Sequence, residues 1–138
     1  MKKIVYLNNK YIHFKDAYVH IEDRGLQFSD SIYEVVKVIN KKLNDFDFHI
    51  RRLRYSIKEL KFNYKIDKIH LNKIFVSLIK KNNLYNGIIY LQITRGVQLR
   101  EHAYKKKLKP NTIIYTTKKK FNLPNKNYKG YKAITYPD

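Results

Sequence analysis

Apolar and polar residues alternate along the first third of the chain, and this period of two predicts β-strands. Two short apolar runs, at 4–7 and 11–14, flank Asn8 and Asn9. Because asparagine tolerates the positive φ angles of a tight turn, these runs are expected to form a hairpin. Residues 32–39 are rich in β-branched side chains and predict a longer strand.

The alternation in 32–39 also divides the side chains between the two faces of the expected strand. One face carries Tyr33, Val35, Lys37 and Ile39, and the other carries Ile32, Glu34, Val36 and Val38. A turn at Asn40 and Lys41 would then lead into another short strand.

In the middle of the chain the apolar residues recur every three or four positions, which is typical of amphipathic helices. Asp47 is the expected N-cap of the first helix, and Asn86 with Gly87 is expected to close the second as a C-cap or turn. The apolar stripes of the two helices are Ile50, Leu53, Ile57 and Leu60, followed by Leu71, Ile74, Phe75 and Leu78.

Strand-like runs return at 88–94 and 112–117, separated by a polar, basic loop at 97–110. Strands followed by two helices and then by more strands predict an α+β fold, in which a largely antiparallel sheet carries two helices on one side.

The composition changes near residue 118. Residues 119–129 are rich in lysine and asparagine and contain a proline, which predicts an interdomain linker. We therefore expect a small domain at 1–118, and at 130–138 the start of the first strand of a large domain.

The net charge of +19 raises the possibility of a nucleic-acid partner. However, the chain has 24 lysines and only six arginines, whereas base and phosphate recognition relies strongly on the planar fork of arginine. We interpret the lysines mainly as solubilising surface and keep a basic nucleic-acid-binding module as an alternative.

The chain contains no cysteine, which excludes a disulfide framework and a thiolate metal site. It has no apolar run long enough to span a membrane, and the short apolar run after Met1 is interrupted too early for a signal peptide. A cytoplasmic location is the resulting expectation.

Four stretches stand out together, at 21–35, 49–53, 89–96 and 100–102. They read I-E-D-R-G-L-Q-F-S-D-S-I-Y-E-V, H-I-R-R-L, I-Y-L-Q-I-T-R-G and R-E-H. In this order and spacing they resemble the class IV aminotransferases, enzymes of fold type IV that use pyridoxal 5′-phosphate (PLP), and in particular their D-amino-acid transaminase branch. The resemblance implies the small N-terminal domain of such an enzyme. The family reaction transfers an amino group between D-amino acids and 2-oxo acids.

The resemblance also implies roles for individual residues. Arg52 would bind the cofactor phosphate, because a guanidinium offers paired donors and a positive charge. Tyr33, Arg100 and His102 would bind the substrate carboxylate, with the last two reaching into the partner subunit of a homodimer. Two residues on the face of Tyr33 would line the pocket, Val35 and Lys37.

The loop before Tyr33 is expected to be structural. Glu22, Asp23 and Arg24 would form a salt-bridge cluster that fixes the approach to Tyr33. The family commonly has glycine where Ser29 stands, and glycine permits backbone conformations that serine adopts less readily. A small residue is also common at the position of Ser31.

The family's Schiff-base lysine, and the acid opposite the pyridine nitrogen, would lie beyond Asp138. None of the 24 lysines stands at the matching position. Residues 1–138 are therefore expected to be a truncated form that binds no PLP covalently and is inactive alone. A dimerising scaffold derived from such an enzyme is a further alternative.

Overall fold

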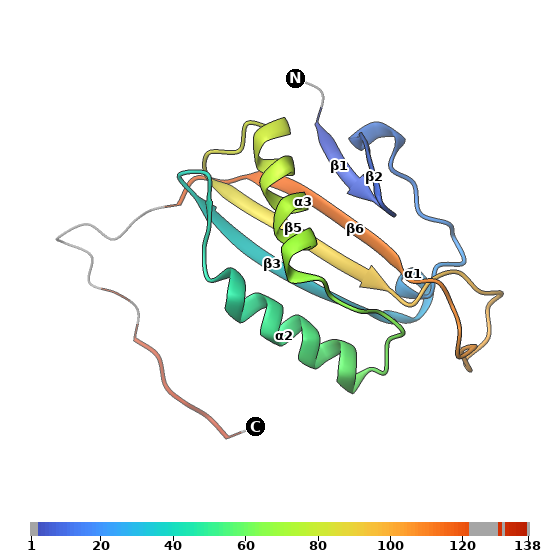
Figure 1. The fold of residues 1–138 in the computed structure, drawn as a ribbon. Coiled ribbons are helices and arrows are strands. Elements are labelled where there is room, and N and C mark those ends of the chain that lie inside the picture. Colours follow the sequence, from blue (N-terminus) through green and yellow to red (C-terminus); the bar gives the residue numbers. More distant parts are fainter. Residues whose placement is uncertain (1–2, 122–129, 131, 138) are drawn as a thin grey trace.

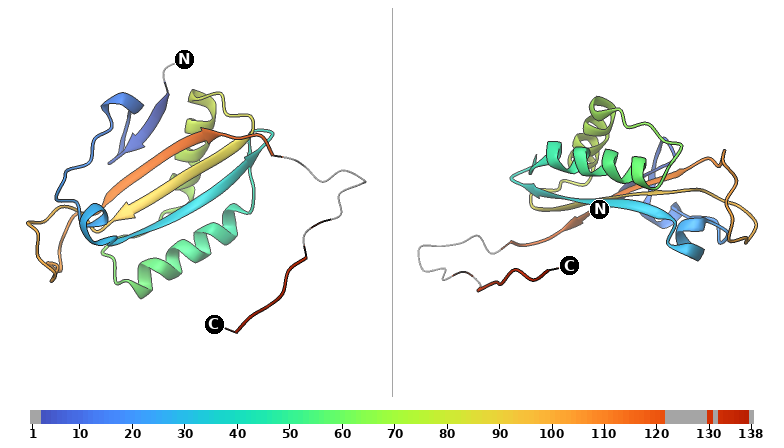
Figure 2. Two further views of the ribbon diagram at one scale, coloured as in Figure 1. Left: turned by 180° about the vertical axis from the view of Figure 1, so that it is seen from behind. Right: turned by 90° about the horizontal axis from the view of Figure 1, so that it is seen from below.

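A six-stranded antiparallel sheet forms one layer of the molecule, and two helices form a second layer on one of its faces (Figures 1 and 2). The structure is a computed structural model that describes residues 3–121, 130 and 132–137. The strand order across the sheet is β2-β1-β6-β5-β3-β4. The α+β prediction, with two helices on one side, is therefore confirmed.

The strands are β1 (Ile4–Leu7), β2 (Lys10–His13), β3 (Ser31–Ile39), β4 (Lys42–Leu43), β5 (Gly87–Thr94) and β6 (Asn111–Lys118). The helices are α1 (Arg24–Phe28), α2 (Phe46–Glu59) and α3 (Lys68–Lys81), with a short 3-10 helix η1 (Phe14–Asp16).

The first hairpin forms as the sequence predicts. Asn8 and Asn9 have φ angles of 47° and 68°, which is the conformation that a two-residue turn between twisted strands requires. Asn8 also connects the hairpin to β6, because its side-chain oxygen accepts a hydrogen bond from the backbone of Thr112 at 2.9 Å.

The core lies between the sheet and the two long helices. The expected faces of β3 are confirmed, since Ile32, Val36 and Val38 are buried beneath the helices and Tyr33 is exposed on the other side. The apolar stripe of α3 is also buried as its spacing predicts. Sheet residues that complete the core are Ile89, Leu91, Ile93 and Ile114.

Some details of the helices differ from the sequence expectations. The segment 22–31 is not only a loop, because it contains α1, whose N-cap is Asp23. The N-cap of α2 is Asp45, while Asp47 lies in the first turn and pairs with Lys68 at 2.9 Å. The helix α3 ends earlier than expected, at the C-cap Asn82.

Gly87 is the first residue of β5 and not a helix cap. A Cβ atom at this position would lie 2.1 Å from the backbone oxygen of Thr117 on the neighbouring strand. The glycine is therefore required for the close approach of β5 and β6.

The predicted linker 119–129 and strand 130–138 lie largely outside the described residues. Gly130 and residues 132–137, which are described, belong to no strand. The division into domains therefore stays a prediction. Within the described part of the chain, every helix is too short or too polar to cross a membrane.

Replacing Leu78 with alanine tests the packing of α3 on the sheet. Leu78 is completely buried, so the substitution should lower the free energy of unfolding by about 3 kcal/mol through lost burial and a residual cavity. Urea denaturation measures this loss. The control is Ile69→Ala on the exposed side of the same helix, which should change stability by less than about 0.5 kcal/mol. Equal losses in the two variants would contradict the packing described here.

Candidate active site

A buried carboxylate on β3 holds an exposed arginine on α2. Glu34 faces the helices, and its oxygens accept hydrogen bonds from Nε and Nη2 of Arg52 at 2.8 and 2.7 Å. The third partner is Nδ1 of His49, at 2.7 Å. His49 and Arg52 are three residues apart on α2 and therefore share one face of the helix.

The two ends of this ion pair lie in different environments. The Glu34 side chain is 2% exposed, whereas that of Arg52 is 66% exposed. Burial alone would raise the pKa of Glu34, but the hydrogen bonds and charges of Arg52 and His49 lower it below its ordinary value. The hydrogen bond and charge of Glu34 in turn raise the pKa of Arg52. The guanidinium is thus permanently charged and fixed in orientation.

Tyr33 projects from the opposite face of β3. Its ring stacks on that of Tyr90 in β5, with centroids 5.9 Å apart and planes at 15°. Tyr90 in turn packs against Tyr115 in β6 at 5.0 Å. The three neighbouring strands therefore present a row of tyrosines on the face of the sheet that the helices leave open.

Val35 and Lys37 lie on the same face as Tyr33, as the alternation predicts, and both are half-buried. The Lys37 ammonium lies 4.4 Å from the centre of the Phe121 ring. That Val35 and Lys37 line a substrate pocket stays a prediction.

Arg100 and His102 are brought together on the loop between β5 and β6. Both residues are exposed, and both pack against Phe28 of α1. The guanidinium carbon of Arg100 lies 5.2 Å from the Phe28 ring centre, and the His102 ring lies 5.6 Å from it. The loop therefore places a guanidinium and an imidazole against the same aromatic ring.

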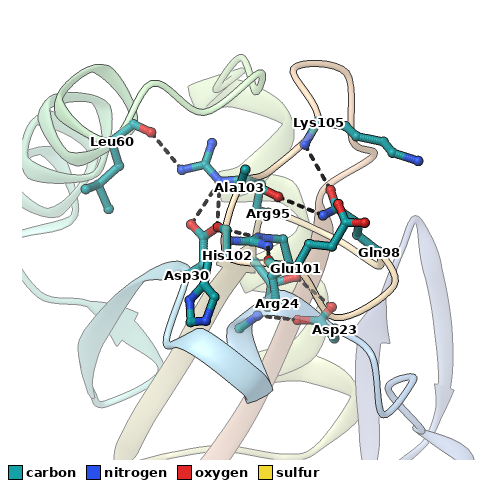
Figure 3. A network of polar contacts seen from close by, with 12 residues as sticks. Asp23, Arg24, Asp30, Leu60, Arg95, Gln98, Glu101, His102, Ala103 and Lys105 are labelled. Carbon is teal, nitrogen blue, oxygen red and sulfur yellow. Dashed lines mark hydrogen bonds and ion pairs between the residues drawn. The ribbon is translucent and has the colours of Figure 1, made fainter.

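Beneath this loop lies a network of buried charges (Figure 3). Asp30 accepts hydrogen bonds from Nε of Arg24 at 2.9 Å and from Nε of Arg95 at 2.8 Å. Burial alone would raise the pKa of Asp30, but Arg95 and Arg24 lower it below its ordinary value. Asp30 is therefore a fixed anion between two arginines.

The structure corrects the expected cluster at 22–24. The ion-pair partner of Arg24 is Asp30 and not Glu22 or Asp23. Asp23 is completely buried and accepts hydrogen bonds from the backbone of Gly25 and the hydroxyl of Thr94, both at 2.8 Å. These contacts fix the loop before Tyr33.

Serine is accommodated at both positions where the family commonly has glycine or a small residue. Ser29 adopts the left-handed conformation, with φ of 54°, as the C-cap of α1. The Ser31 hydroxyl accepts a hydrogen bond from the Gln92 side chain at 2.9 Å.

The alternation of the strand puts Glu34 on the face of Ile32, Val36 and Val38, but it predicts no role for this carboxylate. A single carboxylate on the same strand face as Ile32, Val36 and Val38 could have identified Glu34 as a functional candidate, because a buried carboxylate needs a hydrogen-bonding or charged partner. Asp30 and Arg95 were missed for a different reason, since they are 65 positions apart in sequence. Within the described residues, no cluster of His, Asp and Glu is suited to bind a metal ion.

Residues 31–137 match the family model described as amino-transferase class IV. This match covers most of the chain, so the chain belongs to that family, as the four motifs suggested.

Among curated proteins, the chain is similar to D-alanine aminotransferases. It is 36% identical over 138 residues to that of Staphylococcus epidermidis, covering 97% of this chain and 48% of the relative. It is 42% identical over 94 residues to that of Listeria monocytogenes, covering 68% of this chain and 32% of the relative. The chain thus spans between about a third and a half of the length of these relatives.

Solved structures of the family share the fold. The Escherichia coli branched-chain amino acid aminotransferase superimposes with a TM-score of 0.79 at 20% identity, covering 92% of this chain and 47% of the other. The branched-chain aminotransferase of Thermoproteus uzoniensis with norvaline gives 0.74 at 15% identity, covering 86% and 41%. A further branched-chain amino acid aminotransferase, with pyridoxamine 5′-phosphate, gives 0.80 at 12% identity, covering 90% and 42%. The expected fold type is therefore confirmed.

The Glu34 ion pair should make stability depend on pH. The pKa of Glu34 in the folded protein is below its ordinary value of 4.5, so the stabilisation is complete above that pH and is lost as the pH falls through and below it. Glu34→Gln should lower the free energy of unfolding by about 1–3 kcal/mol at pH 7. It should also flatten the decline in stability below pH 4.5. Urea denaturation across this range measures both effects.

The control for this prediction is Asp47→Asn, which removes an exposed carboxylate from α2, the helix that carries His49 and Arg52. It should leave the steepness of the acid decline unchanged. An equally steep decline in the Glu34→Gln variant and in the wild type would contradict the role assigned to the Glu34 carboxylate.

Proposed function

We propose that residues 1–138 are the small-domain part of a D-amino-acid transaminase, which transfers an amino group between D-amino acids and 2-oxo acids with PLP. The observation that carries the proposal is the Glu34–Arg52 ion pair. This ion pair holds a guanidinium in one orientation at the protein surface. The family match and the similarity to D-alanine aminotransferases support the same reaction.

The geometry of Arg52 fits the phosphate group of PLP. Nε and Nη2 are engaged by Glu34, and Nη1 donates to none of the described residues. A phosphate can therefore accept from the free edge of the guanidinium without breaking the ion pair. When bound, PLP supplies the electron sink that the amino transfer needs. Arg52 would hold its phosphate end.

Tyr33, Arg100 and His102 would bind the carboxylate that D-amino acids and 2-oxo acids share. Arg100 and His102 pack on the same Phe28 ring, and a guanidinium with a nearby imidazole favours a carboxylate by charge and by hydrogen bonding. The exposure of Arg100 and His102 on a loop at the end of the sheet is consistent with their reaching the site of a second subunit in a homodimer.

The reactive lysine would belong to sequence that follows residue 138. None of the lysines in 1–138 stands at the family's position, and the chain spans at most about half of its curated relatives. Proton transfer at the substrate would thus be carried out by a residue outside this chain. The residues described here would position the cofactor and substrate for that step.

The test uses the D-alanine aminotransferase of Staphylococcus epidermidis, whose sequence aligns with 97% of this chain. Residues 1–138 replace the aligned part of that protein and are joined to the rest of it. The joined protein should convert D-alanine and 2-oxoglutarate to pyruvate and D-glutamate, whereas residues 1–138 alone should not. A joined protein that folds and binds PLP, yet does not turn over D-alanine, would refute the proposal.

The same joined protein tests Arg52. Arg52→Gln should weaken PLP binding by about tenfold to a hundredfold, because a hydrogen bond to a charged group is lost. Arg52→Lys keeps the charge beside Glu34 and separates a loss of phosphate binding from a loss of folding. The matched control is Arg51→Gln, since Arg51 packs on Phe48 on the same helix. Similar PLP affinities in the Arg51 and Arg52 variants would remove Arg52 from the phosphate site.

A further inference from the structure

Arg24 links the buried charge network to the loop that carries Arg100 and His102 (Figure 3). All three guanidinium nitrogens of Arg24 donate hydrogen bonds. Nε donates to Asp30 at 2.9 Å, Nη1 to the carbonyl of Glu101 at 2.7 Å, and Nη2 to the carbonyl of His102 at 3.1 Å. One buried side chain therefore holds the carbonyl groups of the two residues that follow Arg100.

The charge balance of the network explains why backbone carbonyls are recruited. Arg24 and Arg95 are both buried, and they share one carboxylate, that of Asp30. Because one carboxylate serves two guanidinium groups, each arginine has further N–H groups to satisfy, and a buried charge is costly unless other acceptors surround it. Arg95 finds its acceptors at the end of α2, where Nη2 donates to the carbonyl of Leu60 at 2.8 Å. Arg24 finds its acceptors in the loop.

The aromatic ring of Phe28 supports the same loop from α1. The Arg24 guanidinium carbon lies 4.6 Å from the centre of this ring, which also contacts the side chains of Arg100 and His102. Two residues of the short helix α1 therefore hold the loop. Arg24, at the start of the helix, binds the backbone of residues 101–102, and Phe28, at its end, packs against the side chains of residues 100 and 102.

Gln98 closes the loop on itself. Its side chain donates to the carbonyl of Ala103 and accepts from the backbone of Lys105, both at 2.9 Å. Residues 99–107 are nevertheless exposed, and they include the lysine run 105–107. Such a loop would ordinarily be mobile. Here its backbone is fixed on one side by Gln98 and on the other by Arg24.

We propose that Arg24 is a positioning residue for substrate binding, which holds the backbone of residues 101–102 so that Arg100 and His102 are presented together to the substrate carboxylate. The proposal deepens the proposed function and rests on it. The ligand class is the carboxylate common to D-amino acids and 2-oxo acids. Arg24 itself is buried, with 5% of its side chain exposed, and acts only through the loop.

The test variant is Arg24→Lys. A lysine ammonium keeps the positive charge beside Asp30, but it is a single point donor and cannot reach both carbonyls in the forked geometry of a guanidinium. The control is Asn82→Ala, which removes buried hydrogen bonds to Ile4 and Thr116 and does not touch the loop. Both variants should lose stability, but only the first should release the loop.

The first measurement is amide hydrogen exchange on the 138-residue chain. In Arg24→Lys, the amides of residues 99–105 should exchange about tenfold faster, because two backbone carbonyls lose their donors. The amides of α3 should keep their wild-type rates relative to global stability. In Asn82→Ala the loop should exchange as in the wild type. Unchanged loop exchange in Arg24→Lys, or equal release by Asn82→Ala, would overturn the proposal.

The second measurement uses the joined transaminase. Arg24→Lys should raise the KM for D-alanine and for 2-oxoglutarate about tenfold, because both substrates present a carboxylate. The kcat and the affinity for PLP should stay within about twofold of the wild type. A fall in kcat at constant KM would overturn the positioning role. If the wild-type joined protein is inactive, the proposed function fails, and the exchange data still decide whether Arg24 holds the loop.

Discussion

The Glu34 carboxylate is the group on which the arrangement of this domain depends. It lies on the helix-facing side of β3 between Ile32 and Val36, where an unpaired carboxylate would be strongly destabilising. Its partners, His49 and Arg52, are one helical turn apart on α2. The need to pair this charge therefore fixes the rotation of α2 over the sheet, and the same contacts bring the Arg52 guanidinium to the surface in one orientation.

The sheet then distributes the remaining candidate residues by their position along and across the strands. Tyr33 is adjacent to Glu34 in sequence but projects from the open face, in the row of tyrosines formed by β3, β5 and β6. Arg100 and His102 lie on the loop that joins β5 to β6. The phosphate-binding candidate and the carboxylate-binding candidates thus come from different parts of the described fold.

The parts of this arrangement that follow local periodicity could be predicted from the sequence. Alternation in β3 places Tyr33 and Glu34 on opposite faces, and the apolar stripe of α3 identifies its buried side. The capping of α2 could not be predicted in the same way, since the choice between Asp45 and Asp47 depends on backbone conformation and on the pairing of Asp47 with Lys68.

The charge network beneath the loop could not be predicted from local pattern either. Its members, Arg24, Asp30, Arg95 and the carbonyls of residues 101–102, come from two stretches, 24–30 and 95–102, which meet only in the folded chain. The sequence suggested a cluster at 22–24 because those charges are adjacent, but adjacent side chains on a cap and short helix point in different directions. The roles of Arg52 and of the Arg100–His102 pair came from the family motifs and not from periodicity.

The most direct test of this account is whether Arg52 recognises a phosphate group. Arginine side-chain NMR signals of the 138-residue chain can be followed during titration with pyridoxamine 5′-phosphate and, separately, with pyridoxamine. Neither compound has an aldehyde that would react with the 24 lysines. The Arg52 signal should shift with the phosphorylated compound and not with pyridoxamine, while the Arg51 signal should change little. Equal shifts of Arg51 and Arg52 would indicate diffuse attraction to the +19 chain and would contradict the account, as would an unchanged Arg52 signal.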